Sequence, residues 1–224
     1  MLRDTKTMRC LQCMKSHFIV PILRRHVNSH RKLSFYCLST GRTGTRFLSR
    51  VLDTATNAQV LHQPAPQLKE TVVRSVVSAY SQDISAFAAL KLENFPQLEE
   101  KILRQLHLDA EVYGDTLNHM FPFGYMLYNY LGQEKLRLVH LIRNPVDCGR
   151  SILIAERNHG SGDRFQELRP PSFLEGNTDA EKVACIWNSV NAMIRKQFEL
   201  IDNPEVCMVL RLEDINVETL RELF

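Results

Sequence analysis

The chain has 224 residues and a mass of 25.9 kDa, which corresponds to one large domain. Its 44% hydrophobic and 24% charged content is close to the average for globular proteins, which excludes a collagen-like, coiled-coil or wholly disordered chain. The longest apolar run near the N-terminus is Phe18–Val20, followed by Pro21. Because a membrane-spanning helix needs about 20 apolar residues, we expect a soluble protein without a transmembrane anchor.

The net charge of +3 is unevenly distributed along the chain. Residues 1–34 carry eight basic side chains and one acidic side chain, whereas the remainder carries 20 basic and 24 acidic ones. We interpret residues 1–32 as a basic N-terminal extension and residues 33–224 as one α/β domain. Such a leader is most often a solvated tail, although its Arg-rich composition leaves organelle targeting open. We expect a cytoplasmic protein with no nucleic-acid partner.

Six cysteines are scattered through the chain, a density typical of reduced thiols in an intracellular protein. Cys10 and Cys13 have the spacing of half a zinc site. A structural zinc ion needs four ligands, and no second pair follows at the usual interval. We therefore expect no metal.

Short apolar runs alternate with helical patterns along the chain. Strands are expected at Leu33–Leu38, Ala58–His62, Glu111–Tyr113, Leu136–Ile142 and Val206–Leu212. Helices are expected from Thr45 to about Thr54, over 67–108 with a break near Pro96, between Asp115 and Tyr130, from Pro145, at about Asp179–Ile201 and from Glu213 onward, with a loop over 159–178. This alternation predicts an α/β fold in three layers, with a mostly parallel central sheet flanked by helices. Ligands bind such sheets beyond the carboxyl ends of the strands.

The loop after the first strand contains the run Gly41-Arg42-Thr43-Gly44-Thr45-Arg46. A glycine-containing turn between a strand and a helix can cradle an anion with its backbone N–H groups, helped by the helix dipole. The two threonines add hydroxyl donors and Arg42 adds a fixed charge. A nucleotide kinase loop would instead need Gly, four residues and Gly-Lys-Ser/Thr. That lysine is missing here, so a magnesium-dependent triphosphate site is disfavoured.

A second candidate loop follows the strand Leu136–Ile142. It reads Arg143-Asn144-Pro145-Val146-Asp147-Cys148-Gly149-Arg150-Ser151. Arg143 stands at the carboxyl end of the strand, and a guanidinium can bind a phosphate in a forked geometry. Ser151, about two helical turns later, adds a hydroxyl. Alternatively, Asn144 and Pro145 simply begin a helix.

Together the two loops resemble those of the PAPS-dependent sulfotransferase superfamily, where PAPS is 3′-phosphoadenosine 5′-phosphosulfate. The run Gly41–Phe47 is similar to the family's 5′-phosphosulfate loop, and Arg143–Ser151 to its 3′-phosphate motif. A later run, Arg211–Asp214, is similar to a further family segment. The resemblance covers about Leu33 to Ile215 and implies a P-loop-type fold.

The resemblance also implies a function, namely transfer of a sulfuryl group from PAPS to an acceptor hydroxyl or amine on a carbohydrate, small molecule or protein, without a metal. It further implies which residues hold the co-substrate. The residues implied for the 5′-phosphosulfate are Gly41, Arg42, Thr43, Gly44, Thr45 and Arg46, with Phe47 stacking on adenine or packing in the core, and Arg143 and Ser151 for the 3′-phosphate. Arg42 would also act in catalysis, by stabilising the negative charge that builds up on the leaving group.

The general base is the least determined part of the predicted site. One branch of the family has a glutamate after the second strand, where this chain has Gln63, preceded by His62. Another branch has its base after the next strand, where this chain has Asp115, and His119 four residues later. We rank Asp115 first, His62 second and His119 third. Each has a structural alternative as a helix cap or a hydrogen-bonded surface residue.

Family members often have a further glycine-rich loop beyond the Arg211–Asp214 segment, so we expect 33–224 to be a shortened or C-terminally truncated domain. We expect the acceptor to contact the 67–108 helices, the 159–178 loop and Trp187. The alternative functions are a non-catalytic nucleotide-binding module of the same fold, favoured by Gln63, and, less favoured, a P-loop nucleotide kinase.

Overall fold

The computed structural model describes residues 33–65, 68–106, 110–159, 173 and 175–221. The predicted basic extension at 1–32 and most of the 159–178 loop lie outside these residues.

Within the described residues the strands form one five-stranded sheet in the order β2-β3-β1-β4-β5. The strands are β1 (Leu33–Leu38), β2 (Ala58–Leu61), β3 (Val112–Asp115), β4 (Leu136–Ile142) and β5 (Cys207–Arg211), and every neighbouring pair is parallel. The predicted α/β fold with a parallel central sheet is confirmed. The third strand begins one residue later and ends two residues later than predicted, because the sequence pattern at Gly114 and Asp115 indicates a turn.

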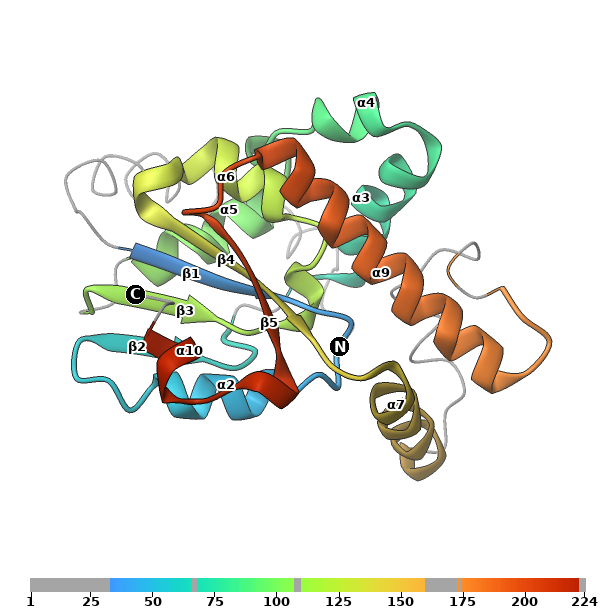
Figure 1. Cartoon of the computed structure of the whole chain (residues 1–224). Helices are drawn as coiled ribbons and strands as arrows, with labels where there is room; N and C mark the ends of the chain where they lie inside the picture. The colour runs from blue at the N-terminus through green and yellow to red at the C-terminus, as the bar shows by residue number, and fades with distance from the viewer. Residues whose placement is uncertain (1–32, 66–67, 107–109, 160–172, 174, 222–224) are drawn as a thin grey trace, which may run out of the picture.

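Helices connect the strands (Figure 1). They are α2 (Thr45–Leu52), α3 (Glu70–Gln82), α4 (Ile84–Ala88), α5 (Pro96–Leu106), α6 (Gly124–Leu131), α7 (Pro145–His159), α9 (Asp179–Ile201) and α10 (Val217–Arg221), with short 3₁₀ turns η1 (Leu92–Asn94), η2 (Asn118–Met120), η3 (Gln133–Lys135) and η5 (Leu212–Asp214). Pro96 and Pro145 begin helices, as proline can. The region 67–108 has an additional break at Asp83, whose carboxylate accepts hydrogen bonds from the N–H groups of Ser85 and Ala86 and so caps α4.

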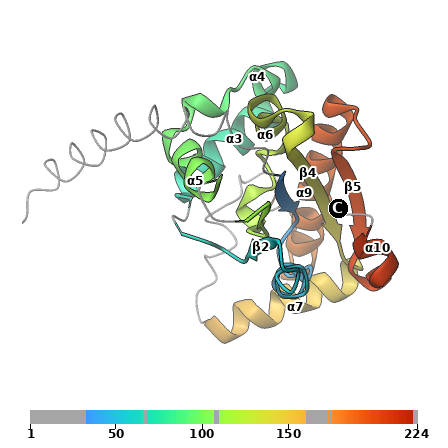
Figure 2. The ribbon, with the colours of Figure 1, turned by 90° about the vertical axis from the view of Figure 1, so that its left-hand side faces the viewer.

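The alternation of side chains along the strands produces two apolar layers. Tyr36 and Leu38 of β1 pack with residues of α3, α5, α6 and α9 on one face of the sheet. Phe35 and Cys37 pack on the other face with Leu48 and Leu52 of α2, and α10 closes that side. The sheet therefore lies between two helical layers, as Figure 1 and Figure 2 show from two directions. Figure 1 shows α7 beyond the end of β4, at the edge of the sheet where β1 also ends.

Gly114 lets β3 fit tightly between its neighbours. It is in register with Phe35 of β1 and Val60 of β2. A Cβ atom at this position would lie 2.8 Å from both methyl groups of Val60 and 3.1 Å from the Phe35 ring. The side chains of the two neighbours thus fill the space that a residue at 114 would need.

We predict that Gly114→Ala destabilises the protein by about 1–3 kcal/mol through overpacking. In urea unfolding, the double variant Gly114→Ala/Val60→Ala should lose less unfolding free energy than the two single variants lose together. The reason is that alanine at position 60 makes room for the new methyl group. Strictly additive losses would contradict the proposed contact.

Candidate functional site

The turn between β1 and α2 has a tightly constrained backbone. Gly41, Arg42 and Gly44 have φ angles of 85°, 57° and 91°, in the left-handed region that costs a residue with a side chain about 1–2 kcal/mol. A Cβ atom at Gly44 would also lie 2.5 Å from Cδ1 of Leu212. Gly44 is therefore required both by its own conformation and by the close approach of the late 3₁₀ turn η5.

The first turn of α2 has backbone donors that no side chain caps. Its N-cap residue is Gly44, which has no side chain to accept a hydrogen bond, and the N–H of Leu48 makes the bond to the Gly44 carbonyl. The N–H groups of the first three residues, 45–47, precede this bond and point out of the helix end. The buried hydroxyl of Thr43 also has no partner among the described residues. This end of α2 suits an anion.

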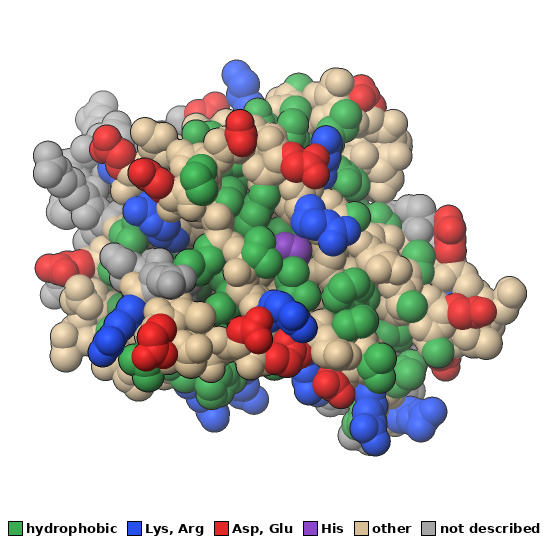
Figure 3. Space-filling view, in the orientation of Figure 1, with side chains coloured by type: hydrophobic (Ala, Val, Ile, Leu, Met, Phe, Trp, Pro, Cys, Tyr) green, Lys and Arg blue, Asp and Glu red, His purple; other side chains and the backbone are tan. Residues whose placement is uncertain are grey.

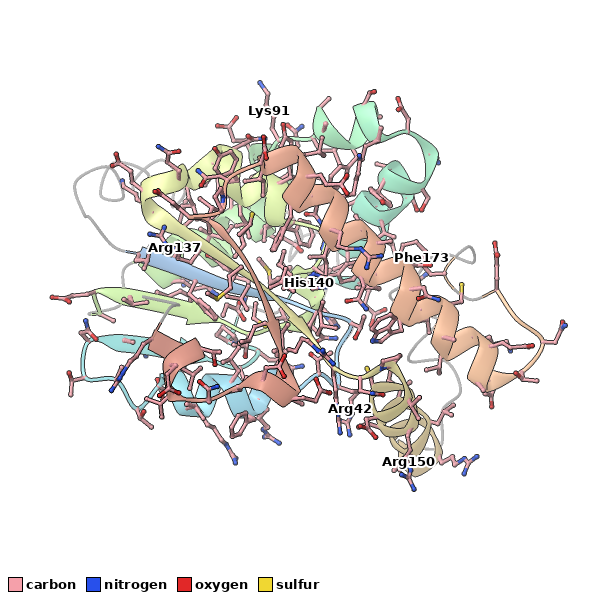
Figure 4. All side chains as sticks on the ribbon, viewed as in Figure 1. Arg42, Lys91, Arg137, His140, Arg150 and Phe173 are labelled. Carbon is pink, nitrogen blue, oxygen red and sulfur yellow. The ribbon has the colours of Figure 1, made fainter. Side chains whose placement is uncertain are left out.

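The two loops singled out from the sequence contact each other directly. Nη1 of Arg143 donates to the carbonyl oxygen of Arg42 over 3.1 Å, and Nε of Arg42 donates to Oγ of Ser151 over 3.1 Å. In Figure 4, Arg42 lies where the end of β4 meets the start of α7. The thiol of Cys148 donates to the Gly41 carbonyl over 3.5 Å, which ties α7 to the same loop. The structure thus brings the Gly41–Arg46 and Arg143–Ser151 runs to one edge of the sheet.

The turn at Arg143 and Asn144 is held by more distant elements. Oδ1 of Asn144 accepts from the N–H of Val146 and caps α7, as the sequence predicts. The Asn144 N–H donates to Oε1 of Glu213 over 2.7 Å, a bond that lowers the pKa of Glu213, with smaller effects from nearby arginines. The indole N–H of Trp187 donates to the Arg143 carbonyl over 3.3 Å. Sequence analysis missed both contacts, because their partners are 69 and 44 residues away.

Positive charge gathers on the helices beside these loops. Arg42, Arg46 and Arg50 are exposed at and along α2, and Arg150 is exposed on α7. Figure 3 shows Lys and Arg side chains projecting below α2 and α7. Phe47 lies on the same outer side of α2 with 52% of its surface exposed, so its ring does not pack in the core beside Leu48.

His62 follows β2 and contacts Thr116, the residue that follows β3. Nδ1 of His62 lies 3.1 Å from Oγ1 of Thr116, while the Thr116 hydroxyl donates to the Leu61 carbonyl over 3.4 Å. The direction of the His62–Thr116 bond depends on the tautomer of the ring. With the proton on Nδ1, the Thr116 hydroxyl is left to donate to Leu61 and the lone pair of His62 is on Nε2. Partial burial lowers the pKa of His62, and Arg46 lowers it further. The ring is therefore neutral at pH 7.

The segment after β3 links His62 to the glycine loop. Thr116 touches His62, and two residues later the Asn118 amide lies 3.1 Å from the position of a Cβ on Gly41. Two residues span at most about 7 Å, so His62 and the loop flank the same short segment. His119 comes next in η2 and is half-buried. The sequence did not single out Asn118, since one asparagine at the start of a turn carries no functional pattern.

Asp115 occupies a different environment from His62. Its side chain is fully buried and pairs with the equally buried Lys101 over 3.1 Å. Its other partners are Nε2 of Gln105 at 3.2 Å and the N–H of Leu117 at 2.8 Å. Burial raises the pKa of Asp115, while Lys101 opposes that shift. Lys101 also donates to the Pro64 carbonyl over 2.7 Å. This carboxylate therefore joins β3 to α5 and to the 62–64 turn, and both of its oxygens accept hydrogen bonds.

Among the described residues no helix has the length and apolarity needed to cross a membrane. The same part of the chain contains no group of three or more His, Cys, Asp or Glu side chains placed to hold a metal ion. Cys10 and Cys13 lie outside it. The described cysteines are Cys37, Cys148, Cys185 and Cys207, and the first two are buried.

Neither a protein-family model nor a curated protein matches the sequence. Among solved structures, the fold is similar to the sulfotransferase from Alicyclobacillus acidocaldarius, with a TM-score of 0.49, 13% identity and coverage of 85% of this chain and 75% of that one. It is also similar to the sulfotransferase domain from the curacin biosynthetic pathway, with a TM-score of 0.49, 15% identity and coverage of 87% and 71%. These similarities concern the fold alone.

We predict that Lys101→Met destabilises the protein by about 3–5 kcal/mol, because it leaves the Asp115 carboxylate buried without its counter-ion. The double variant Lys101→Met/Asp115→Asn removes both charges and should recover most of that loss in chemical denaturation. Arg104→Ala on the same helix breaks the exposed pair with Glu100 and should cost less than about 1 kcal/mol. A Lys101→Met loss as small as that of Arg104→Ala would contradict a buried ion pair.

Proposed function

We propose that this protein transfers a sulfuryl group from PAPS to an acceptor hydroxyl or amine of a carbohydrate, small molecule or protein. The observation that carries the proposal is the contact between Arg143 and the Arg42 carbonyl. It sets a phosphate-type glycine loop and a second arginine–serine loop side by side. One nucleotide with phosphate groups at both its 5′ and 3′ positions fits this pairing of two anion sites.

In this proposal the uncapped N–H groups at 45–47 and the Arg42 guanidinium bind the 5′-phosphosulfate. Arg143 and Ser151 bind the 3′-phosphate, and the exposed ring of Phe47 stacks on the adenine. When bound, PAPS supplies the sulfuryl group, whose bond to the 5′-phosphate oxygen breaks as the bond to the acceptor forms. Arg42 and the loop N–H groups stabilise the negative charge that develops on that oxygen.

We assign the general base to His62 rather than to Asp115. A base needs an available lone pair within reach of the acceptor. We assign to His62 the tautomer with its proton on Nδ1, toward Thr116, and its lone pair on Nε2; the ring is half-buried, and burial lowers its pKa. Asp115 is wholly buried and hydrogen-bonded at both oxygens. We propose that Asp115 holds the turn carrying His62 through Lys101 and Pro64, while His62 Nε2 takes the acceptor proton.

Calorimetry with 3′-phosphoadenosine 5′-phosphate (PAP) against adenosine 5′-phosphate (AMP) tests the nucleotide assignment. PAP should bind more tightly, and Arg143→Ala should weaken PAP about 10- to 100-fold, the effect of losing a charge-assisted hydrogen bond. AMP binding should change little. Arg137→Ala is the matched control, since Arg137 lies at the other end of the same strand (Figure 4). Equal affinity of the parent for PAP and AMP would overturn the proposal.

The pH dependence of turnover tests the base. Because the pKa of His62 is lowered from 6.5 and the base acts in its neutral form, kcat/KM should be highest at pH 8 and fall on the acid side. The midpoint of that fall should lie below 6.5. His62→Ala should lower the rate by about 10²–10⁴-fold. The double variant Lys101→Met/Asp115→Asn should still show the fall of kcat/KM at low pH. If the double variant lost that fall and His62→Ala kept the parent rate, Asp115 would be the general base. If the protein bound PAP but transferred sulfate to no acceptor, it would be a binding module.

A further inference from the structure

The peptide bond between Arg143 and Asn144 is held by side chains at both of its polar atoms. Its carbonyl oxygen accepts from Nε1 of Trp187 over 3.3 Å, and its N–H donates to Oε1 of Glu213 over 2.7 Å. These partners come from α9 and η5. Holding both ends of one peptide unit fixes the orientation of its plane, and hence the direction in which the Arg143 side chain leaves the backbone.

Trp187 is itself supported by a chain of buried hydrogen bonds. Nδ2 of Asn191, one helical turn later, donates to the Trp187 carbonyl over 2.7 Å. Oδ1 of Asn191 lies 2.7 Å from Nε2 of His140. Since the amide nitrogen of Asn191 is the donor at one end, its oxygen accepts from His140 Nε2–H at the other.

The chain of hydrogen bonds returns to β4, whose last residue precedes Arg143. The His140 ring in β4 contacts Asn191, and the Arg143 carbonyl just after β4 contacts Trp187, four residues earlier on α9. Figure 4 shows His140 beside β4 under α9. His140 and Asn191 have 0% and 1% of their surfaces exposed. Burial lowers the pKa of His140 to about 4, so the ring is neutral and the direction of the hydrogen bonds is constant near neutral pH.

Polar residues in this position are costly, because the surrounding core is apolar and Nδ1 of His140 is buried with no partner among the described residues. A leucine at both positions would avoid that cost. The benefit that the geometry offers in return is the constraint on Arg143.

We propose that Trp187, supported by Asn191 and His140, is a positioning residue that aims Arg143 at the 3′-phosphate and so determines the preference for PAP over AMP. This inference rests on the proposed function. It gives Trp187 a role on the nucleotide side of the site, in place of the acceptor contact expected from the sequence.

The test is the ratio of the PAP and AMP affinities in Trp187→Phe, measured by calorimetry on the full chain. Phenylalanine keeps an aromatic ring against Cys148, Ile152 and Val183 but removes the indole N–H. PAP affinity should fall about 3- to 10-fold, the effect of one hydrogen bond, with AMP affinity unchanged. His140→Leu/Asn191→Leu, which keeps the indole and removes its support, should lower the ratio in the same direction.

Val183→Ala is the matched control. It removes packing from the same cluster without touching a hydrogen bond of the chain, so it should lower stability and leave the ratio at the parent value. A Trp187→Phe ratio equal to that of the parent, or an equal fall in Val183→Ala, would overturn the positioning role. These outcomes are distinct from a failure of the proposed function, in which the parent itself would not prefer PAP.

Discussion

The hydrogen bond from the Arg143 guanidinium to the Arg42 carbonyl is the contact on which the site depends. It can form because β1 and β4 are adjacent and parallel, so the loops that follow them leave the sheet at the same edge. Had the two strands been antiparallel, the same two sequence runs would lie at opposite edges of the sheet. Had they been parallel but not adjacent, the runs would lie too far apart for this hydrogen bond. The sheet order therefore brings two modest sequence patterns together in one candidate site, with several arginines beside it.

The glycine loop combines strain with unsatisfied polar groups. Arg42 has a backbone conformation that is unfavourable for a residue with a side chain. The first turn of α2 lacks a side-chain cap, and the Thr43 hydroxyl has no partner in the described part of the chain. Such features are costly in a purely structural turn. They are what a site needs if an anion is to complete its hydrogen bonding.

Two buried polar networks flank this region, and each connects to one side of it. On the β2–β3 side, Lys101 and Asp115 tie the 62–64 turn to the sheet. On the β4 side, His140 and Asn191 support Trp187 against the Arg143 carbonyl. Burying polar groups gains little stability over apolar packing, but it restricts the arrangements the surrounding chain can adopt. Both networks restrict a loop that carries a proposed functional residue.

The sequence by itself determined the α/β class, the positions of most strands and the two loops proposed to bind anions. These depend on local patterns: short apolar runs, glycine in a left-handed turn, and Asn144 with Pro145 at a helix start. Only the tertiary structure decided that Asp115 is sealed against Lys101, that His62 contacts Thr116, and that Trp187 contacts Arg143. Those properties depend on partners far along the chain or on burial, and spacing within one segment carries no information about either.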